Sequence, residues 1–254
     1  MDNGFFISRF CTYADTDSLK ELWHICFGDA FSDIDVYFNT AFSPGNSAVI
    51  ECNGKIVSMV LLPESSIVYK GKIRKAVYFY AVCTHPDYRN KGFITSLFDF
   101  AEKELKKRNV EILFLVPENR ELLKMYGKFG FCEFCFPCEK LTAGVKKAKQ
   151  AELTFEIYKQ IKLKQSNSFP VNIWNEKEFS YFLNSPFSTC VCVKSENNYG
   201  YFLYNDENEI TEWGGSTELF DFCAGKFGTA KIPITAKYLS EPVLPSGFYF
   251  GNPT

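Results

Sequence analysis

The run of apolar residues from Val77 to Cys83 constrains the fold more than any other part of the sequence. A strand that is apolar on both faces belongs in the middle of a sheet that is covered on each side. The run leads into Pro86 and Gly92, and then into a segment with helical periodicity from about Thr95 to Arg108. A second buried strand is expected at Glu111 to Val116. The order strand, turn, helix, strand predicts an α/β fold with a central sheet covered by helices.

Shorter elements are expected on both sides of this unit. The pair Asn53-Gly54 separates two apolar runs and is a strong signal for a β-hairpin. Upstream, Leu19, Leu22, Trp23 and Cys26 recur at helical spacing before Gly28, which predicts a helix that ends there. Downstream, a helix at Arg120 to Lys128 and a strand from Phe131 close the unit.

The charge and the N-terminus exclude some classes of partner. The 254 residues include 28 Lys and Arg against 30 Asp and Glu, which gives a formal net charge of −2. Without a long basic run, nucleic acid is not expected as the principal partner. The N-terminus carries early acidic residues and no sustained apolar stretch, so neither a secretory signal nor a membrane span is expected. These features predict a cytoplasmic protein that does not bind membranes.

The ten cysteines are expected to be reduced thiols, because no secretory signal accompanies them. Cys132, Cys135 and Cys138 have the two-residue spacing seen in zinc and iron-sulfur ligands, but the sequence supplies no fourth ligand at a recognisable distance. We therefore predict strand thiols and no metal. Cys83 is likewise predicted to be an inert buried thiol, since no basic partner is expected beside it.

The segment from Thr84 to Thr95 carries the features of an anion site. A turn that opens a helix exposes backbone N–H groups, and the helix dipole adds partial positive charge there. Arg89 and Lys91 add formal charge, and Gly92 allows an anion to approach the main chain. The glycine patterns of Rossmann folds and of P-loops are both absent. On these residues alone, a phosphate site and an ordinary solvated turn both remain open.

Two motifs in this region resemble a known family. HPDYRNKGFITSLFDFAEKEL resembles the pyrophosphate-binding motif of the GNAT superfamily of N-acetyltransferases, and LFLVPENRELLKMYGKFGF resembles its next strand, helix and closing signature. Tyr126, Gly130 and Phe131 supply the Tyr-x-x-x-Gly-Phe part of that signature. Ile94 departs from the motif, because most members have Gly or Ala there. The wider pattern is similar to the multidomain branch of the enhanced-intracellular-survival type.

The resemblance implies a fold and a domain organisation. The fold would be an α/β GNAT acyltransferase fold, a mixed central sheet flanked by helices, followed by a second, smaller, degenerate GNAT-like α+β domain. We expect the acetyl-coenzyme A-binding GNAT domain at residues 1–140, a helical linker at 141–165 and the smaller domain at 166–254. The acceptor cleft would lie between the two domains, where Tyr37, Trp174 and Trp213 are candidate lining residues, with an ordinary core role favoured for Trp213.

The resemblance also implies the roles of individual residues. Strand residues Val82, Cys83 and Thr84 would offer main-chain groups to the acetyl and pantetheine portions of the cofactor, and Asn119 would contact its pantetheine arm or adenosine side. Tyr126 would be the general acid that protonates the departing thiolate. The pyrophosphate would lie on the turn formed by Arg89, Asn90, Lys91, Gly92, Phe93, Ile94 and Thr95.

The implied activity is transfer of an acetyl group from acetyl-coenzyme A to a primary amine by direct attack in a ternary complex. The general base is not determined by the sequence; His85, Glu118, His24 and the terminal carboxylate of Thr254 are candidates. Two other functions remain open, namely a non-catalytic acyl-coenzyme A sensor and an aminoacyl-tRNA-dependent transferase. The identity of the amine and the formation of a homo-oligomer are also left open.

Overall fold

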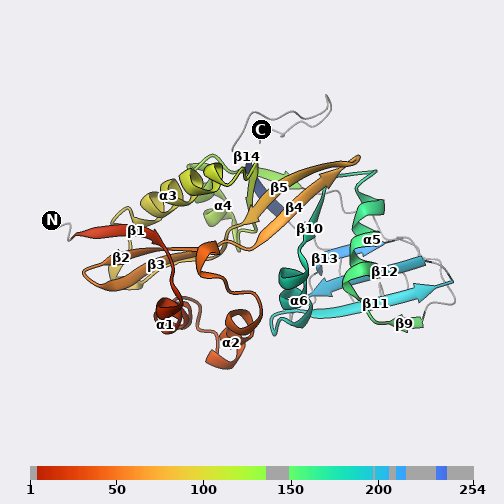
Figure 1. Cartoon of the computed structure of the whole chain (residues 1–254), viewed down its shortest axis with the longest axis horizontal. Helices are drawn as coiled ribbons and strands as arrows, with labels where there is room; N and C mark the ends of the chain where they lie inside the picture. Colours follow the sequence, from red (N-terminus) through yellow and green to blue (C-terminus); the bar gives the residue numbers. More distant parts are fainter. Residues whose placement is uncertain (1–4, 136–148, 197, 206–209, 216–232, 239–254) are drawn as a thin grey trace.

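The computed structural model describes residues 5–135, 149–196, 198–205, 210–215 and 233–238. Three sheets and their covering helices follow one another along the long axis of the molecule (Figure 1). The predicted α/β class with mixed sheets is confirmed. The α-helices are α1 Thr16–Phe27, α2 Phe31–Thr40, α3 Phe93–Lys107, α4 Arg120–Gly127, α5 Phe155–Gln165 and α6 Glu176–Asn184, and the short 3-10 helices are η1 Tyr13–Asp15, η2 Pro44–Asn46 and η3 Pro86–Tyr88.

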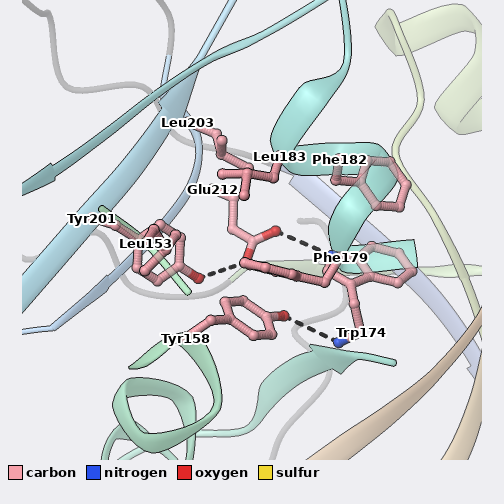
Figure 2. A pocket seen from close by; sticks show the side chains of 9 residues that line it. All are labelled: Leu153, Tyr158, Trp174, Phe179, Phe182, Leu183, Tyr201, Leu203 and Glu212. Carbon is pink, nitrogen blue, oxygen red and sulfur yellow. Dashed lines mark hydrogen bonds between the residues drawn. The ribbon is translucent and has the colours of Figure 1, made fainter. Parts of the chain in front are cut away.

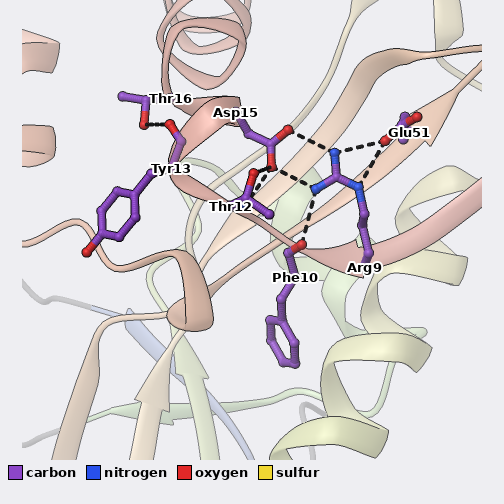
Figure 3. Close-up of polar contacts among 7 residues, drawn as sticks. All are labelled: Arg9, Phe10, Thr12, Tyr13, Asp15, Thr16 and Glu51. Carbon is purple, nitrogen blue, oxygen red and sulfur yellow. Dashed lines mark hydrogen bonds and ion pairs between the residues drawn. The ribbon is translucent and has the colours of Figure 1, made fainter.

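The first sheet is antiparallel and has the order β1-β2-β3-β6. Its strands are β1 Phe6–Phe10, β2 Ser47–Cys52, β3 Lys55–Leu61 and β6 Tyr80–Thr84. The predicted hairpin at Asn53-Gly54 is confirmed, because β2 pairs with β3 and both turn residues have positive φ. At the end of β1, Arg9 joins the sheet to η1: its guanidinium pairs with Asp15 at 2.7 Å and with Glu51 at 2.8 Å (Figure 3).

The second sheet is mixed and has the order β10-β4-β5-β7-β14-β8. Its strands are β4 Glu64–Tyr69, β5 Lys72–Tyr78, β7 Ile112–Leu115, β8 Cys132–Cys135, β10 Val171–Trp174 and β14 Pro233–Tyr238. Among the described strand pairs of this sheet, β5–β7 alone is parallel. β10 and β14 come from the C-terminal half of the chain, so both halves contribute strands to this sheet. The domain boundaries that we predicted from the sequence remain a prediction.

One long hairpin connects the first sheet to the second. The chain passes from β3 into β4 through Leu62 and Pro63, turns at Lys70-Gly71, and returns through β5 into β6. The expectation of a single strand from Val77 to Cys83 was therefore wrong. Ala81 has a φ of 47°, and the register between β3 and β6 shifts between Met59 and Leu61. This irregularity separates β5 from β6, because an extra residue bends a strand and disrupts its ladder.

The third sheet is antiparallel, has the order β13-β12-β11-β9 and lies wholly in the C-terminal half. Its strands are β9 Lys149–Ala151, β11 Thr189–Ser195, β12 Asn198–Tyr204 and β13 Ile210–Gly215. The described part of the predicted helical linker contains the strand β9 as well as the whole of helix α5, so the expectation of helix alone was wrong there. Among the described helices, none has the length and hydropathy needed to cross a bilayer.

Three apolar clusters hold these layers together. The first lies between the first two sheets and the helices α3 and α4, with Leu97, Phe98 and Leu113 fully buried. The second lies between the strands β2, β3 and β6 and the helices α1, α2 and α6, and it includes Trp23 and Tyr181. The third packs α5 and α6 between the second and third sheets. Strand β6 therefore has α3 and α4 on one side and α1 and α2 on the other.

Candidate active site

The strand β6 separates from β7 immediately after the break at Phe79. The parallel pairing of β5 with β7 ends at Tyr78 and Phe114, and the amide of Phe79 donates a last hydrogen bond of 2.8 Å to the Phe114 carbonyl. Beyond this point, the only strand that β6 pairs with in the described part of the chain is β3. The other edge of β6 keeps backbone groups without a ladder partner. Val82, Cys83 and Thr84, the strand residues predicted to face the cofactor, lie on this strand.

Part of the main chain at the end of β6 is already hydrogen bonded. The Ser58 hydroxyl donates to the Cys83 carbonyl at 2.8 Å and lies 2.8 Å from the Thr84 hydroxyl. The Thr84 carbonyl accepts from Nε of Arg89 at 3.2 Å. The carbonyls of Cys83 and Thr84 are therefore occupied by bonds within the protein. Of the three predicted strand residues, Val82 is the one whose main-chain groups remain for a ligand.

The turn from Arg89 to Gly92 directs a row of amides outward at the start of α3. Asn90 and Gly92 both have positive φ, 62° and 79°, and Gly92 is the N-cap of the helix. Within the described residues, no acceptor pairs with the N–H groups of residues 90 to 95. A side chain at Gly92 would point into open space, since no atom lies within 4 Å of a Cβ placed there. The turn thus has the unpaired donors and the free approach that an anion requires.

The two cations predicted at this turn point in different directions. Arg89 reaches back to the Thr84 carbonyl, to which its Nε donates at 3.2 Å. The Lys91 ammonium donates to the Asp87 carbonyl at 3.1 Å and lies 4.7 Å from the centre of the Tyr88 ring. Both side chains are exposed. Each can turn toward an anion at the turn, because a lysine or arginine head moves easily on its flexible stem.

Tyr126 lies in the last turn of α4 and is 7% exposed. Its ring stacks parallel to that of Phe98, with 6.1 Å between centroids and 8° between planes. Burial, followed by the nearby Cys83 thiol, raises the pKa of the Tyr126 hydroxyl to about 12. The hydroxyl has no hydrogen bond to another described residue. The geometry therefore holds a protonated, uncommitted phenol close to β6.

The remaining predicted residues have local roles in the structure. Asn119 is the N-cap of α4, and its side-chain oxygen accepts from the Leu122 amide at 2.9 Å. His85 Nδ1 accepts from the Asp87 amide at 3.2 Å, and His24 lies against the Asp29 carbonyl at 2.8 Å. Glu118 is exposed, before α4. Thr254 lies outside the described residues, as does Cys138 of the cysteine triplet, so neither position is informed by the structure.

Of the aromatic residues predicted to line an acceptor cleft, Tyr37 and Trp174 are buried in the apolar clusters. Trp174 borders a small cavity of about 10 Å³, the room of one water molecule (Figure 2). The one charged group in its lining, Glu212, accepts from Nε1 of Trp174 and from the Tyr201 hydroxyl and pairs with Lys162 at 2.9 Å. The carboxylate is thus satisfied internally, and this cavity does not suit an amine substrate.

One residue near the site was not predicted as functional. Cys26 fits the apolar stripe of α1, and its spacing indicates only a core residue. In the fold Cys26 packs against the buried cluster that contains Cys83, and the Cys83 thiol, followed by the Arg89 guanidinium, lowers the pKa of its thiol to about 7. Only the packing of α1 on β6 brings these residues together, so no local pattern in the sequence could reveal it. The described residues contain no group of three or more His, Cys, Asp or Glu side chains suited to a metal ion.

Comparison with known protein families decides the assignment. The model of the acetyltransferase (GNAT) domain matches residues 8–134, half of the chain. The chain belongs to the GNAT acetyltransferase family. The match includes β6, the turn and α4, and it confirms the resemblance inferred from the two motifs. An acetyltransferase of this family uses acetyl-coenzyme A as its acetyl donor, in agreement with the predicted cosubstrate, and the unpaired amides at α3 and the free edge of β6 fit that molecule.

Solved structures extend the likeness of the fold beyond the matched domain. A GCN5-related N-acetyltransferase from Anabaena variabilis superposes with a TM-score of 0.70 at 14% identity, over 93% of this chain and 73% of that one. A GCN5-related N-acetyltransferase from Kribbella flavida superposes with a TM-score of 0.64 at 14% identity, over 94% of this chain and 65% of that one. Eis1 from Mycobacterium abscessus superposes with a TM-score of 0.55 at 11% identity, over 87% of this chain and 62% of that one, which is a likeness of fold. A search of curated proteins found no significant sequence match.

Proposed function

We propose that this acetyltransferase moves the acetyl group of acetyl-coenzyme A to a primary amine by direct attack in a ternary complex. The observation that carries the proposal is the conjunction of three features: unpaired amides at the start of α3, a free edge on β6, and the uncommitted hydroxyl of Tyr126. The amides suit the diphosphate of the cofactor, the strand edge suits its amide-bearing pantetheine arm, and the hydroxyl can protonate the thiolate that leaves.

The diphosphate of the cofactor would lie on residues 89 to 95. The amides of Asn90 to Thr95 would donate to its oxygens, and the positive end of the α3 dipole would add to their effect. Arg89 and Lys91 would exchange their present carbonyl partners for phosphate oxygens, which are stronger acceptors because they are charged. Gly92 keeps this surface free of a side chain.

The pantetheine arm would extend along the free edge of β6 and pair with the main chain at Val82. The bulge at Ala81 supports this step, because it turns strand groups away from β7. Asn119 would contact the arm through its side-chain nitrogen, since its oxygen caps α4. The bound cofactor supplies an acetyl group activated as a thioester.

Tyr126 would hold the proton that the departing sulfur takes up. Because its pKa is about 12, the Tyr126 hydroxyl is protonated across the physiological range. It is therefore available as a proton donor. A phenol suits this role because a thiolate leaves with a full negative charge, which a nearby donor neutralises as it forms. The packing of the ring against Phe98 would fix the position of the hydroxyl.

The test measures binding and turnover separately on the full chain. Calorimetric titration with acetyl-coenzyme A gives the dissociation constant, and thiol release is then followed colorimetrically with a panel of polyamines, aminoglycosides, small amines and N-terminal peptides. Release that depends on one class of amine, with an equal amount of acetylated product by mass spectrometry, supports the proposal. Binding without release from any amine favours a sensor. Release that requires tRNA, with strong salt dependence, favours the tRNA-dependent transferase.

A further inference from the structure

The hydroxyls of two tyrosines join the two halves of the chain beside the candidate active site. Tyr80 begins β6, and Tyr181 lies in α6 of the C-terminal half, where it is 0% exposed. Their hydroxyl oxygens are 2.8 Å apart, a normal length for a hydrogen bond. Because solvent does not reach the Tyr181 side chain, the loss of this bond would not be compensated by water there.

Aromatic rings from three elements surround the ring of Tyr80. Its centroid lies 5.5 Å from that of Trp23 in α1, 5.7 Å from that of Tyr37 in α2 and 5.6 Å from that of Tyr78 in β5. Tyr37 also meets the ring of Tyr181 edge to face, at 4.9 Å. Ring contacts of this kind restrict how the Tyr80 ring can tilt, and the hydroxyl bond fixes its far end. The position of the Tyr80 side chain is therefore set by both halves of the chain.

Directly after Tyr80 the backbone is strained. Ala81 has a φ of 47°, in the left-handed region that alanine rarely adopts, and the register with β3 shifts at this point. Such a conformation persists only where the surrounding contacts determine it. On the C-terminal side of Ala81, the Cys83 carbonyl is held by the Ser58 hydroxyl at 2.8 Å. On the N-terminal side, the anchored side chain of Tyr80 supplies the corresponding restraint.

The strained residue determines the direction of the strand edge that the cofactor would use. Val82 follows Ala81, and its main-chain groups are the ones that remain for the pantetheine arm. In the described part of the chain β6 has β3 as its only strand partner, so no second ladder aims the opposite edge. A shift of about 1 Å at this edge would misplace the thioester, and misplacements of that size cost up to about 100-fold in rate.

We propose that Tyr181 is a positioning residue for acetyl transfer, an inference that rests on the proposed function. Through the hydroxyl of Tyr80 it keeps Ala81 in the left-handed conformation. The edge at Val82 is thereby held where the arm of the cofactor can pair with it. Since Tyr181 is buried, its effect passes through Tyr80 and not through contact with a substrate. The C-terminal half thus acts on catalysis without contributing a group to the reaction.

The first test compares Tyr181→Phe with a matched control, Tyr201→Phe, in the full chain. Tyr201 is 1% exposed in the third sheet, and its hydroxyl donates to Glu212 at 2.7 Å. Each variant loses one buried hydrogen bond, so both should unfold at a lower urea concentration than the wild type. Tyr181→Phe should also slow thiol release at saturating acetyl-coenzyme A and amine by about tenfold, whereas Tyr201→Phe should keep the wild-type rate.

Binding provides a second readout that does not need turnover. ADP carries the diphosphate but no pantetheine arm, so a change in the ratio of its dissociation constant to that of acetyl-coenzyme A reports on the arm. In Tyr181→Phe this ratio should fall about fivefold by calorimetry, while the dissociation constant of ADP changes by less than about twofold because the turn is untouched. Tyr201→Phe should leave both quantities as they are in the wild type.

Tyr80→Phe and the double variant test the two hydroxyls as a unit. Because both hydroxyls serve one bond, Tyr80→Phe should reproduce the losses of Tyr181→Phe, and the double variant should lose no more than either. Additive losses would overturn the inference, as would a Tyr181→Phe variant that is destabilised like Tyr201→Phe but keeps the wild-type rate and ratio.

The two readouts also separate this inference from the proposed function. A wild-type chain that binds acetyl-coenzyme A but releases no thiol with any amine would contradict the proposed transfer, and the affinity ratio would still decide whether Tyr181 positions the strand edge. A wild-type chain that binds acetyl-coenzyme A no better than ADP would overturn both.

Discussion

Replacement of Tyr126 by Phe removes one hydroxyl group and leaves the ring in place. The ring is stacked on Phe98, and the hydroxyl has no hydrogen bond to another described residue, so the free energy of unfolding should change by less than about 0.5 kcal/mol. If this hydroxyl is the general acid, kcat should fall by about 10²- to 10⁴-fold, equivalent to about 3 to 5 kcal/mol of barrier. The dissociation constant of acetyl-coenzyme A should change by less than about twofold, because the diphosphate site is untouched.

The pH dependence of turnover sharpens this prediction. Since the pKa of Tyr126 is raised to about 12, about 99% of the acid remains protonated at pH 10, against about half for an ordinary tyrosine. Wild-type thiol release at saturating substrates should therefore not decline between pH 7 and pH 10 through loss of this proton. Tyr199→Phe, which removes a phenol hydroxyl from β12, is the matched control and should keep full turnover. An unchanged kcat in Tyr126→Phe would refute the assigned role.

Three further changes test the turn and the framework. Gly92→Ala and Gly92→Glu both place a side chain at a φ of 79°, so they share the same backbone strain. Gly92→Glu should weaken the binding of acetyl-coenzyme A, measured by calorimetry, by at least about tenfold more than Gly92→Ala, because its carboxylate repels the diphosphate. Equal losses of affinity in the two variants would place the diphosphate elsewhere. Arg9→Met should lower the free energy of unfolding in urea by about 1 to 2 kcal/mol at pH 7. Because Arg9 lowers the pKa of Asp15, this contribution is complete above pH about 5 and is lost progressively as the pH falls below the ordinary pKa of an aspartate toward the lowered one; a difference that did not shrink between pH 5 and pH 2 would contradict it. Lys162→Met removes the buried ammonium and leaves the half-buried Glu212 carboxylate without its cation, which should cost about 3 kcal/mol. Most of this loss should be recovered when Lys162→Met is combined with Glu212→Gln; a double variant as unstable as Lys162→Met would show that the loss comes from packing.

The sequence was most informative where local chemistry determines the backbone. The Asn53-Gly54 hairpin follows from residues that tolerate positive φ, and the start of α3 follows from Gly92 and the periodicity behind it. The break between β5 and β6 could not be predicted, because the residues on both sides of it are uniformly apolar. Its cause is the register with β3, in which the chain accommodates an extra residue near Ala81.

The candidate site shows the same division. The residues of the turn and Tyr126 could be predicted from motifs, and they lie within the segment that matches the family. The placement of Cys26 against the cluster that contains Cys83 depends on how α1 packs on β6, which no local pattern encodes. The hydrogen bond of 2.8 Å between Tyr80 in β6 and Tyr181 in α6 likewise joins residues from the two halves of the chain.

The C-terminal half is structurally part of the acetyltransferase sheet. β7 pairs with β5 on one side and with β14 on the other, and β8 is reached only through β14 in the described part of the second sheet. Without Pro233–Tyr238, β7 would present an open backbone edge in the middle of a buried layer, which is costly because those N–H and C=O groups would lose their partners. β10 likewise pairs with the outer edge of β4. Tyr181 packs on the side of β6 opposite α3, and its hydroxyl forms a hydrogen bond with that of Tyr80 in β6. The segment that matches the family thus depends on the rest of the chain for the rigidity of the strand on which the proposed chemistry takes place.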